Sequence, residues 1–190
     1  HNCRYWSDQN PHWMEETHTQ HPQKVNVWAC IGRNSVIGPF FIEGNLTGQR
    51  YLELLQNEVV PALVQRFPAP QPGGIDPHIW FQQDGAPPHY ALPVRHYLNQ
   101  VFPNRWIGRR GQIEWPARSP DLTPLDFFLW GHLKSRVYVN RPENLEDLRH
   151  RIEIEIQMIT PAVLANVQRS FMDRMAHCQA VYGGHFEQLL

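Results

Sequence analysis

The chain has 190 residues, a length that fits one domain with a hydrophobic core. Its 17 lysine and arginine residues against 18 aspartate and glutamate residues give a formal net charge of −1, so the overall charge indicates no nucleic-acid partner. No segment approaches the roughly 20 apolar residues of a membrane helix, and three widely separated cysteines predict neither a disulfide framework nor a cysteine zinc site. The first residue is His1 and no leader pattern follows it, so we expect a fragment that continues upstream.

The first 42 residues combine a polar loop with a predicted hairpin. Residues 1–24 are polar and rich in histidine, and only residues 3–6 suggest a short strand there. Apolar residues then alternate with others over residues 25–31, and residues 37–42 form a second apolar run after an Arg-Asn-Ser turn. This pattern predicts an antiparallel hairpin.

A helix and a buried strand are predicted next. Four apolar residues after Gln49 have the spacing of one helix face: Leu52, Leu55, Val59 and Leu63. Pro61 predicts a kink in this helix, and the proline- and glycine-rich residues 68–77 end it. Residues 79–81 predict a buried strand that delivers Asp84 at its carboxyl end, before a helix over about residues 88–99.

The second half of the chain is predicted to be mainly helical. Residues 113–115 indicate only a weak short strand. Thr123 as N-cap and Pro124 at the first helical position predict the start of a helix. The apolar spacing over about residues 143–180 predicts two further helices, although the alternating isoleucines at 152–156 would also suit a strand.

This order of elements predicts a single α/β domain over residues 1–190, with a mixed sheet flanked by helices. Asp84 lies at the end of a predicted strand and Asp126 lies in the first turn of a predicted helix, with 41 residues between them. Ligands bind such sheets at the carboxyl ends of strands. Two carboxylates at one edge would suit Mg²⁺ and phosphoryl transfer. Each residue taken alone also fits a structural role, as part of an Asp-Gly turn or at the helix dipole.

Two motifs carry a resemblance to a known family. FQQDGAPPH at residues 81–89 and SPDLTPLDFFLW at residues 119–130 closely resemble the second and third acidic motifs of mariner-type transposases, members of the Tc/mariner superfamily with three catalytic acids. The segments HPQKVNVWACI, IGPFFIEGNLTGQRYLELLQNEVVPAL and GGHFEQLL look like the same family. The resemblance therefore covers essentially the whole chain.

The resemblance implies a ribonuclease-H-like fold and a metal-dependent reaction on DNA. Asp84 matches the second catalytic, metal-binding acid and Asp126 matches the third, which leaves Asp121 a structural residue. In the family, two Mg²⁺ or Mn²⁺ ions assist cleavage at the transposon terminal repeats and transfer of the 3′ hydroxyl strand to target DNA. The resemblance thus implies DNA rather than a small molecule as substrate, a homodimer, no membrane partner and a place in the nucleus.

The first catalytic acid of the family has no counterpart in the chain. In the family it stands on the opening strand, upstream of the part that begins at His1, whereas Asp8 lies in a polar segment close to Pro11. We therefore expect a truncated domain that lacks its central first strand, leaves strand edges unpaired and is catalytically inert. The alternative is a decayed or domesticated remnant that binds DNA or a protein partner without catalysis.

Basic residues near the two acids are candidates for DNA contacts. The candidates are His89, Arg105, Arg109, Arg110 and Arg118. The arginines would bring backbone phosphates towards the acids, or they form an ordinary solvated loop. His89, five residues after Asp84, would position that acid or a phosphate, or it is a surface residue.

A zinc-binding interaction module is the alternative from another class of chemistry. It would use the histidine-rich beginning of the chain: His1, Cys3, His12, His18 and His21. Their spacing matches no common zinc pattern, so a polar loop is the better interpretation. Four tryptophans are expected to pack in the core rather than to stack on bases: Trp28, Trp80, Trp115 and Trp130.

Overall fold

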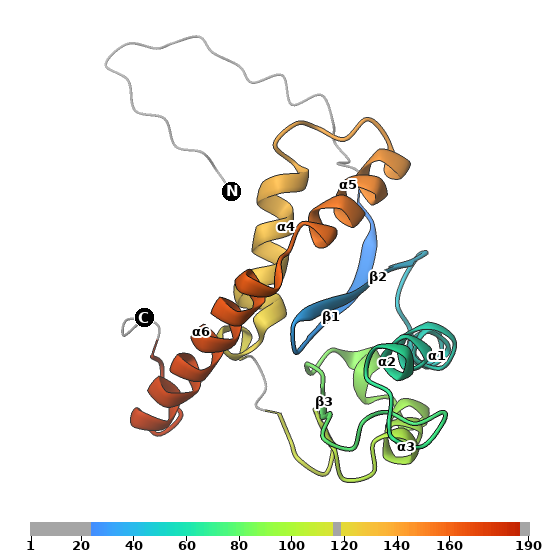
Figure 1. Ribbon diagram of the computed structural model, residues 1–190, viewed down its shortest axis with the longest axis vertical. Helices are drawn as coiled ribbons and strands as arrows, with labels where there is room; N and C mark the ends of the chain where they lie inside the picture. Colours follow the sequence, from blue (N-terminus) through green and yellow to red (C-terminus); the bar gives the residue numbers. More distant parts are fainter. Residues whose placement is uncertain (1–23, 116–118, 187–190) are drawn as a thin grey trace.

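The structure is a computed structural model that describes residues 24–115 and 119–186 (Figure 1). The short strand predicted at residues 3–6 lies outside these ranges, as do Asp8, Arg118 and the residues of the zinc hypothesis. No helix within the two ranges is both long enough and apolar enough to cross a membrane.

The predicted hairpin is confirmed. Strand β1 covers Asn26–Gly32, strand β2 covers Ser35–Ile42, and the two pair antiparallel, with a register shift between Trp28 and Cys30. Trp28 and Cys30 pack against one apolar cluster and Ala29 belongs to another. The alternation in the sequence therefore corresponds to the two faces of the hairpin.

The helix predicted after Gln49 is confirmed as three consecutive segments. These are α1 at Gly48–Leu54, the π-helical segment η1 at Leu55–Val59 and α2 at Val60–Arg66. The Thr47 hydroxyl caps the start by accepting a hydrogen bond from the backbone N–H of Arg50. Pro61 has no N–H to donate to the preceding turn, and the regular α-helical pattern is interrupted by the π-helical turn just before it.

A short parallel sheet follows, and the sequence predicts only some of its elements. Its elements are β3 at Phe81–Gln82, the 3-10 helix η2 at Pro87–Tyr90, helix α3 at Leu92–Val101 and β4 at Trp106–Ile107. The predicted helix start at residue 88 is wrong, because a separate 3-10 turn comes before α3. The sequence predicts no strand at β4, and the strand predicted at residues 113–115 is only an isolated bridge between Ile113 and Ile107.

Helices make up the second half, as predicted. They are η3 at Pro120–Leu122, the π-helical η4 at Leu125–Leu129, α4 at Trp130–Val137, α5 at Leu145–Gln157 and α6 at Pro161–Ala180. The isoleucine-rich segment is helical because Leu148, Ile152 and Ile156 bury one helix face. Thr123 does not cap a helix with its side chain: its hydroxyl donates a hydrogen bond of 3.3 Å to the carbonyl of Ser119.

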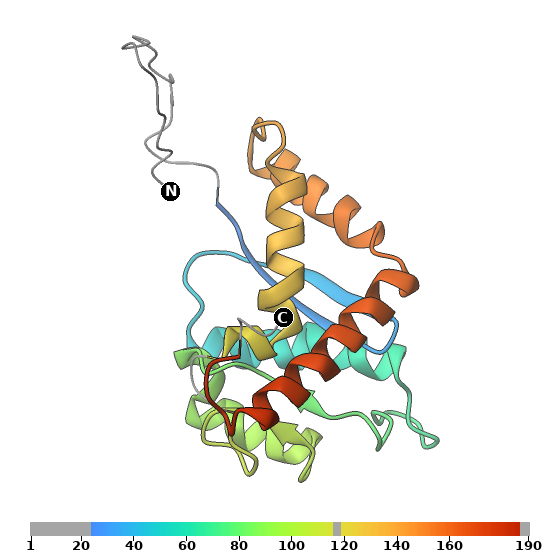
Figure 2. The same ribbon diagram turned by 90° about the vertical axis from the view of Figure 1, so that its left-hand side faces the viewer.

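The hairpin lies between two layers of helices, as Figures 1 and 2 show. Helices α1, α2 and α3 enclose one core, whose largest fully buried members include Tyr51, Leu55, Val59, Leu98, Phe102 and Trp106. Helices α4 and α5 enclose the other, with Leu129, Leu133, Leu148 and Ile152. Trp28 and Trp130 pack against these cores as predicted. Trp80 is 50% exposed, so its predicted place in the core is wrong: it lines a cavity instead.

Candidate functional site

A cavity of about 600 Å³ separates β1 from β3. Residues 27–33 line one side and residues 79–84 line the other, while residues 123–126 also reach it. In the part of the chain that the structure describes, the β1–β2 and β3–β4 sheets share no strand pairing. The buried Nε2 of Gln82 has no hydrogen-bond partner within that part. The cavity therefore has a strand on each side and an unsatisfied donor in its wall.

Asp84 stands two residues after the end of β3 and lines this cavity. Its Oδ1 accepts a hydrogen bond of 3.1 Å from the backbone N–H of Ala86 and lies 2.5 Å from Nδ1 of His89. The hydrogen bond from His89 is the main reason that the pKa of Asp84 lies below its usual range. The side chain is 50% exposed, so the ionised carboxylate faces solvent and cavity together.

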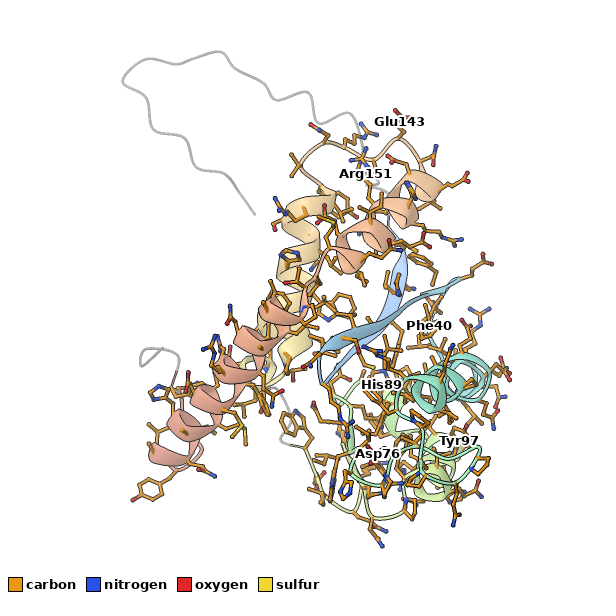
Figure 3. The ribbon with its side chains drawn as sticks, in the orientation of Figure 1. Phe40, Asp76, His89, Tyr97, Glu143 and Arg151 are labelled. Atoms are coloured by element: carbon orange, nitrogen blue, oxygen red, sulfur yellow. The ribbon has the colours of Figure 1, made fainter. Side chains whose placement is uncertain are left out.

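Two buried residues hold His89 in place. The Tyr51 hydroxyl donates a hydrogen bond of 3.0 Å to Oε1 of Gln83, and Nε2 of Gln83 donates one of 2.8 Å to the carbonyl of His89. The ring of Tyr51 also lies against the ring of His89, with centroids 4.4 Å apart. Figure 3 shows His89 between the hairpin and helix α1. The sequence gives no signal for Tyr51, because its spacing is that of any apolar helix position.

Asp126 reaches the same cavity from the start of η4. Its backbone N–H donates a hydrogen bond of 2.9 Å to the carbonyl of Thr123. Partial burial, and secondarily the negative charge of Asp84, raise the pKa of Asp126. The fold thus brings together the two predicted acids, whose environments shift their pKa values in opposite directions.

Arg174 of α6 holds the segment that carries Asp126. Its Nη1 donates a hydrogen bond of 3.2 Å to the carbonyl of Asp121, and its guanidinium carbon lies 4.4 Å from the ring centroid of Phe127. Asp121 therefore contributes a backbone acceptor to this anchor. Sequence analysis does not identify Arg174, because 53 residues separate it from its acceptor.

The predicted basic candidates have different surroundings. Nη1 of Arg105 donates to the carbonyls of Asp76 and Ile79, at 3.2 and 2.9 Å, so this guanidinium ties two loops together. Arg109 and Arg110 are exposed and lie over the ring of Tyr90.

The donor set at the cavity suits a hard divalent cation. Asp84 and Asp126 supply carboxylate oxygens, and Oδ2 of Asp84 accepts no hydrogen bond from the residues that the structure describes. Across residues 24–115 and 119–186, no group of three or more His, Cys, Asp or Glu side chains is placed to hold a metal. Two carboxylates therefore fit such an ion as part of a coordination shell.

Comparison with known proteins shows what the chain is similar to. No protein-family model matches the chain. The chain is 28% identical over 160 residues to the Tc1 transposase of Caenorhabditis elegans and 29% identical over 161 residues to the Tcb1 transposase of Caenorhabditis briggsae. Each alignment covers 83% of this chain and 50% of the relative, so the chain spans about half the length of these curated relatives.

Solved structures agree with this relationship. The catalytic domain of Mos1 mariner transposase has a TM-score of 0.71 at 21% identity, over 87% of this chain and 78% of that one. The Mos1 paired-end complex with the left transposon end has a TM-score of 0.71 at 21% identity, over 97% of this chain and 52% of that one. The chain therefore has the ribonuclease-H-like α/β fold that the Mos1 catalytic domain also has. In sequence the chain is similar to the Tc1 and Tcb1 transposases, and in fold it is similar to the Mos1 catalytic domain.

Proposed function

We propose that this chain is part of the catalytic domain of a DNA transposase, and that Asp84 and Asp126 are two of its metal-binding acids. The observation that carries the proposal is their convergence. Both carboxylates line one cavity although 41 residues separate them in the sequence. The two side chains are close enough to each other for the charge of Asp84 to raise the pKa of Asp126.

Divalent metal binding is supported by the chemistry of the site. Carboxylate oxygens that repel one another are stabilised by a shared cation, and Mg²⁺ prefers such ligands. Mos1 catalytic-domain structures include one with Mg and one with Mn. Divalent ions held by Asp84 and Asp126 would supply Lewis-acid activation for phosphoryl transfer, and two ions is the number that we propose.

We further propose that a β-strand carrying a third carboxylate fills the cavity between β1 and β3. Only β2 pairs with β1 in the described residues, which leaves the other edge of β1 facing the cavity. A strand inserted there would pair with β1 and β3, join the two short sheets and offer acceptors near Nε2 of Gln82. It would also place a third acid between the other two.

DNA is the proposed substrate and partner. Mos1 structures include a paired-end complex with a transposon end and a strand transfer complex. By this relationship we propose transposon terminal repeats and target DNA as ligands, a homodimer on paired ends, and a place in the nucleus. His89 would hold Asp84 in position for its metal ligand role.

The first test measures metal binding by Mn²⁺ titration with electron paramagnetic resonance. Asp84→Asn and Asp126→Asn should each weaken Mn²⁺ binding at least 10-fold, and Asp173→Asn, an exposed control on α6, should leave it unchanged. The catalytic test uses the protein of the whole reading frame on terminal-repeat DNA. Equal cleavage by wild type and Asp84→Ala would refute the proposal.

Binding without catalysis is the competing outcome. A decayed or domesticated remnant would bind DNA in a salt-sensitive manner that neither Mg²⁺ nor Asp84→Asn changes. That result, together with no cleavage by the whole protein, would favour a binding role over a catalytic one.

A further inference from the structure

We propose that Arg109 and Arg110 form a binding site for the phosphate backbone of DNA, with Tyr90 as their common platform. The inference rests on the proposed function, because it names a surface beside Asp84 that would hold the nucleic acid. It is carried by the placement of the turn, the rigidity of the turn and the free charge on the two side chains.

The parallel pairing of β3 and β4 brings the two arginines to the edge where Asp84 lies. Phe81 pairs with Trp106, and the backbone N–H of Gln83 donates a hydrogen bond of 3.0 Å to the carbonyl of Ile107. The chain leaves both strands in the same direction, so the residues that follow them emerge together. Asp84 follows β3 and Arg109 follows β4 two residues after each strand ends.

The turn that carries the arginines is held firmly. The backbone N–H of Gly111 donates a hydrogen bond of 3.0 Å to the carbonyl of Gly108, and a Cβ on Gly111 would come within 2.8 Å of the Trp106 ring. Arg110 has a φ of 58°, a left-handed conformation that is unfavourable for a residue with a side chain. A non-glycine residue in that conformation marks local strain, which is often found at functional sites.

The guanidinium groups of Arg109 and Arg110 both lie over the ring of Tyr90. The guanidinium carbons of Arg109 and Arg110 lie 4.6 and 5.2 Å from the centroid of the Tyr90 ring. The backbone at Tyr90 is held in turn, because its carbonyl accepts a hydrogen bond of 3.1 Å from Nε of Arg95. A guanidinium stacked on an aromatic ring keeps its N–H groups available for two phosphate oxygens.

The two charges are not neutralised within the described part of the chain. Arg109 and Arg110 are both exposed, and neither forms an ion pair with a described residue. Arg109 passes Gly85, where an added Cβ would lie 3.5 Å from the Cδ of Arg109. Arg109 is therefore close to Asp84, but its guanidinium group lies over the Tyr90 ring. Oδ1 of Asp84 instead accepts hydrogen bonds from His89 and Ala86. This separation keeps the carboxylate free for a cation and the arginines free for an anion.

The test is duplex DNA binding by the 190-residue chain, measured by fluorescence anisotropy at several salt concentrations. The double variant Arg109→Ala/Arg110→Ala should weaken binding and reduce the slope of log affinity against log salt by about 2, because each lost phosphate contact removes about 0.9. The matched control Arg136→Ala/Arg169→Ala removes two exposed arginines from α4 and α6 and should leave the slope unchanged.

Tyr90 supplies a second, independent arm of the test. Tyr90→Phe retains an aromatic face and should bind DNA like wild type, whereas Tyr90→Leu should lower the salt slope towards that of the double variant. The inference is overturned if the wild-type chain does not bind DNA, if the double variant keeps the wild-type slope, or if the control pair lowers the slope equally. Mn²⁺ binding should persist in the Arg109→Ala/Arg110→Ala variant and in its control, so the Mn²⁺ titration tests the proposed function separately.

Discussion

The hydroxyl of Tyr51 and the side-chain oxygen of Gln83 are joined by a buried hydrogen bond of 3.0 Å. This bond connects the core of the α1–α3 layer to the residue that immediately precedes Asp84. Because Gln83 also donates to the carbonyl of His89, the same amide fixes the histidine that bonds to Asp84. The position of the exposed acid is thus determined by two side chains that have almost no solvent exposure.

Removal of the Tyr51 hydroxyl should destabilise the protein. Tyr51→Phe leaves the Oε1 of Gln83 buried without its donor, which costs about 1–3 kcal/mol in free energy of unfolding. Urea denaturation followed by circular dichroism measures this difference. Tyr97→Phe is the matched control, because the Tyr97 hydroxyl makes no hydrogen bond within the described residues, and it should change stability by less than about 0.5 kcal/mol. Equal effects of the two substitutions would contradict the role of the Tyr51–Gln83 bond.

Local sequence patterns predict the elements that local contacts stabilise. The alternation of apolar residues over residues 25–31 predicts β1. Apolar residues three and four positions apart predict α5 and α6. Strand β4 is missed because two residues have no period, and their pairing depends on β3, 25 positions earlier in the register. Trp80 is placed wrongly because hydrophobicity alone does not reveal that its strand borders a cavity.

In the candidate site, too, the sequence predicts some residues and tertiary contacts determine the others. The acidic motifs identify Asp84 and Asp126 as candidates through their resemblance to a family, and the fold brings the two residues to one cavity. Tyr51 and Arg174 are found only in three dimensions, because their partners lie 32 and 53 residues away. Supporting residues of a site are bound to it by tertiary contacts, which leave no periodic signal in the sequence.

Replacement of Asp126 by asparagine should stabilise the metal-free protein at neutral pH. Burial and the charge of Asp84 raise the pKa of Asp126, so folding disfavours its ionised form and the carboxylate lowers stability above the unfolded pKa of about 3.9. The gain from Asp126→Asn should be below about 1 kcal/mol, because the side chain is only partly buried and solvent still screens its charge.

Thermal unfolding in the presence of a chelator measures this gain. Below pH 3 the wild-type carboxyl is protonated in both states, so the difference between wild type and Asp126→Asn should vanish. Asp173→Asn, an exposed acid on α6, serves as the control. A variant that is less stable than wild type at pH 7 would show that Asp126 has no unfavourable electrostatic environment.

Loss of Arg174 should loosen the segment that presents Asp126. Arg174→Ala removes the hydrogen bond to the Asp121 carbonyl and the contact with Phe127, together worth about 1–2 kcal/mol. Hydrogen exchange at the amides of Leu122 and Asp126 should quicken, because these amides close the turns that Arg174 supports.

A positioning role for Arg174 also predicts weaker Mn²⁺ binding in Arg174→Ala, with partial recovery in Arg174→Lys. Arg169→Ala, five residues earlier on α6, should change neither hydrogen exchange nor Mn²⁺ binding. Unchanged exchange at Asp126 in Arg174→Ala would show that α6 does not hold the segment.

The connection between α4 and α5 should make the fold sensitive to acid. Asp147 accepts a hydrogen bond of 2.8 Å from Nε of Arg151 and one of 2.8 Å from the backbone N–H of Glu143, and these lower its pKa, with Arg151 as the main cause. Figure 3 shows Glu143 and Arg151 at the end of the molecule where this connection lies. Arg151 also donates to the carbonyl of Asn140 at 2.7 Å, so one guanidinium ties the loop to the helix.

The depressed pKa of Asp147 fixes the direction of the pH effect. Its stabilisation is fully present above the unfolded pKa of about 3.9 and is lost as the pH falls through the lower folded pKa. Asp147→Asn should therefore lower the melting temperature at pH 7, and the difference from wild type should shrink as the pH falls below 4. Asp173→Asn provides the baseline in the same melts. A difference that stays constant from pH 7 to pH 2.5 would mean that the charge of Asp147 does not hold the connection, since only the ionised carboxylate loses its advantage in acid.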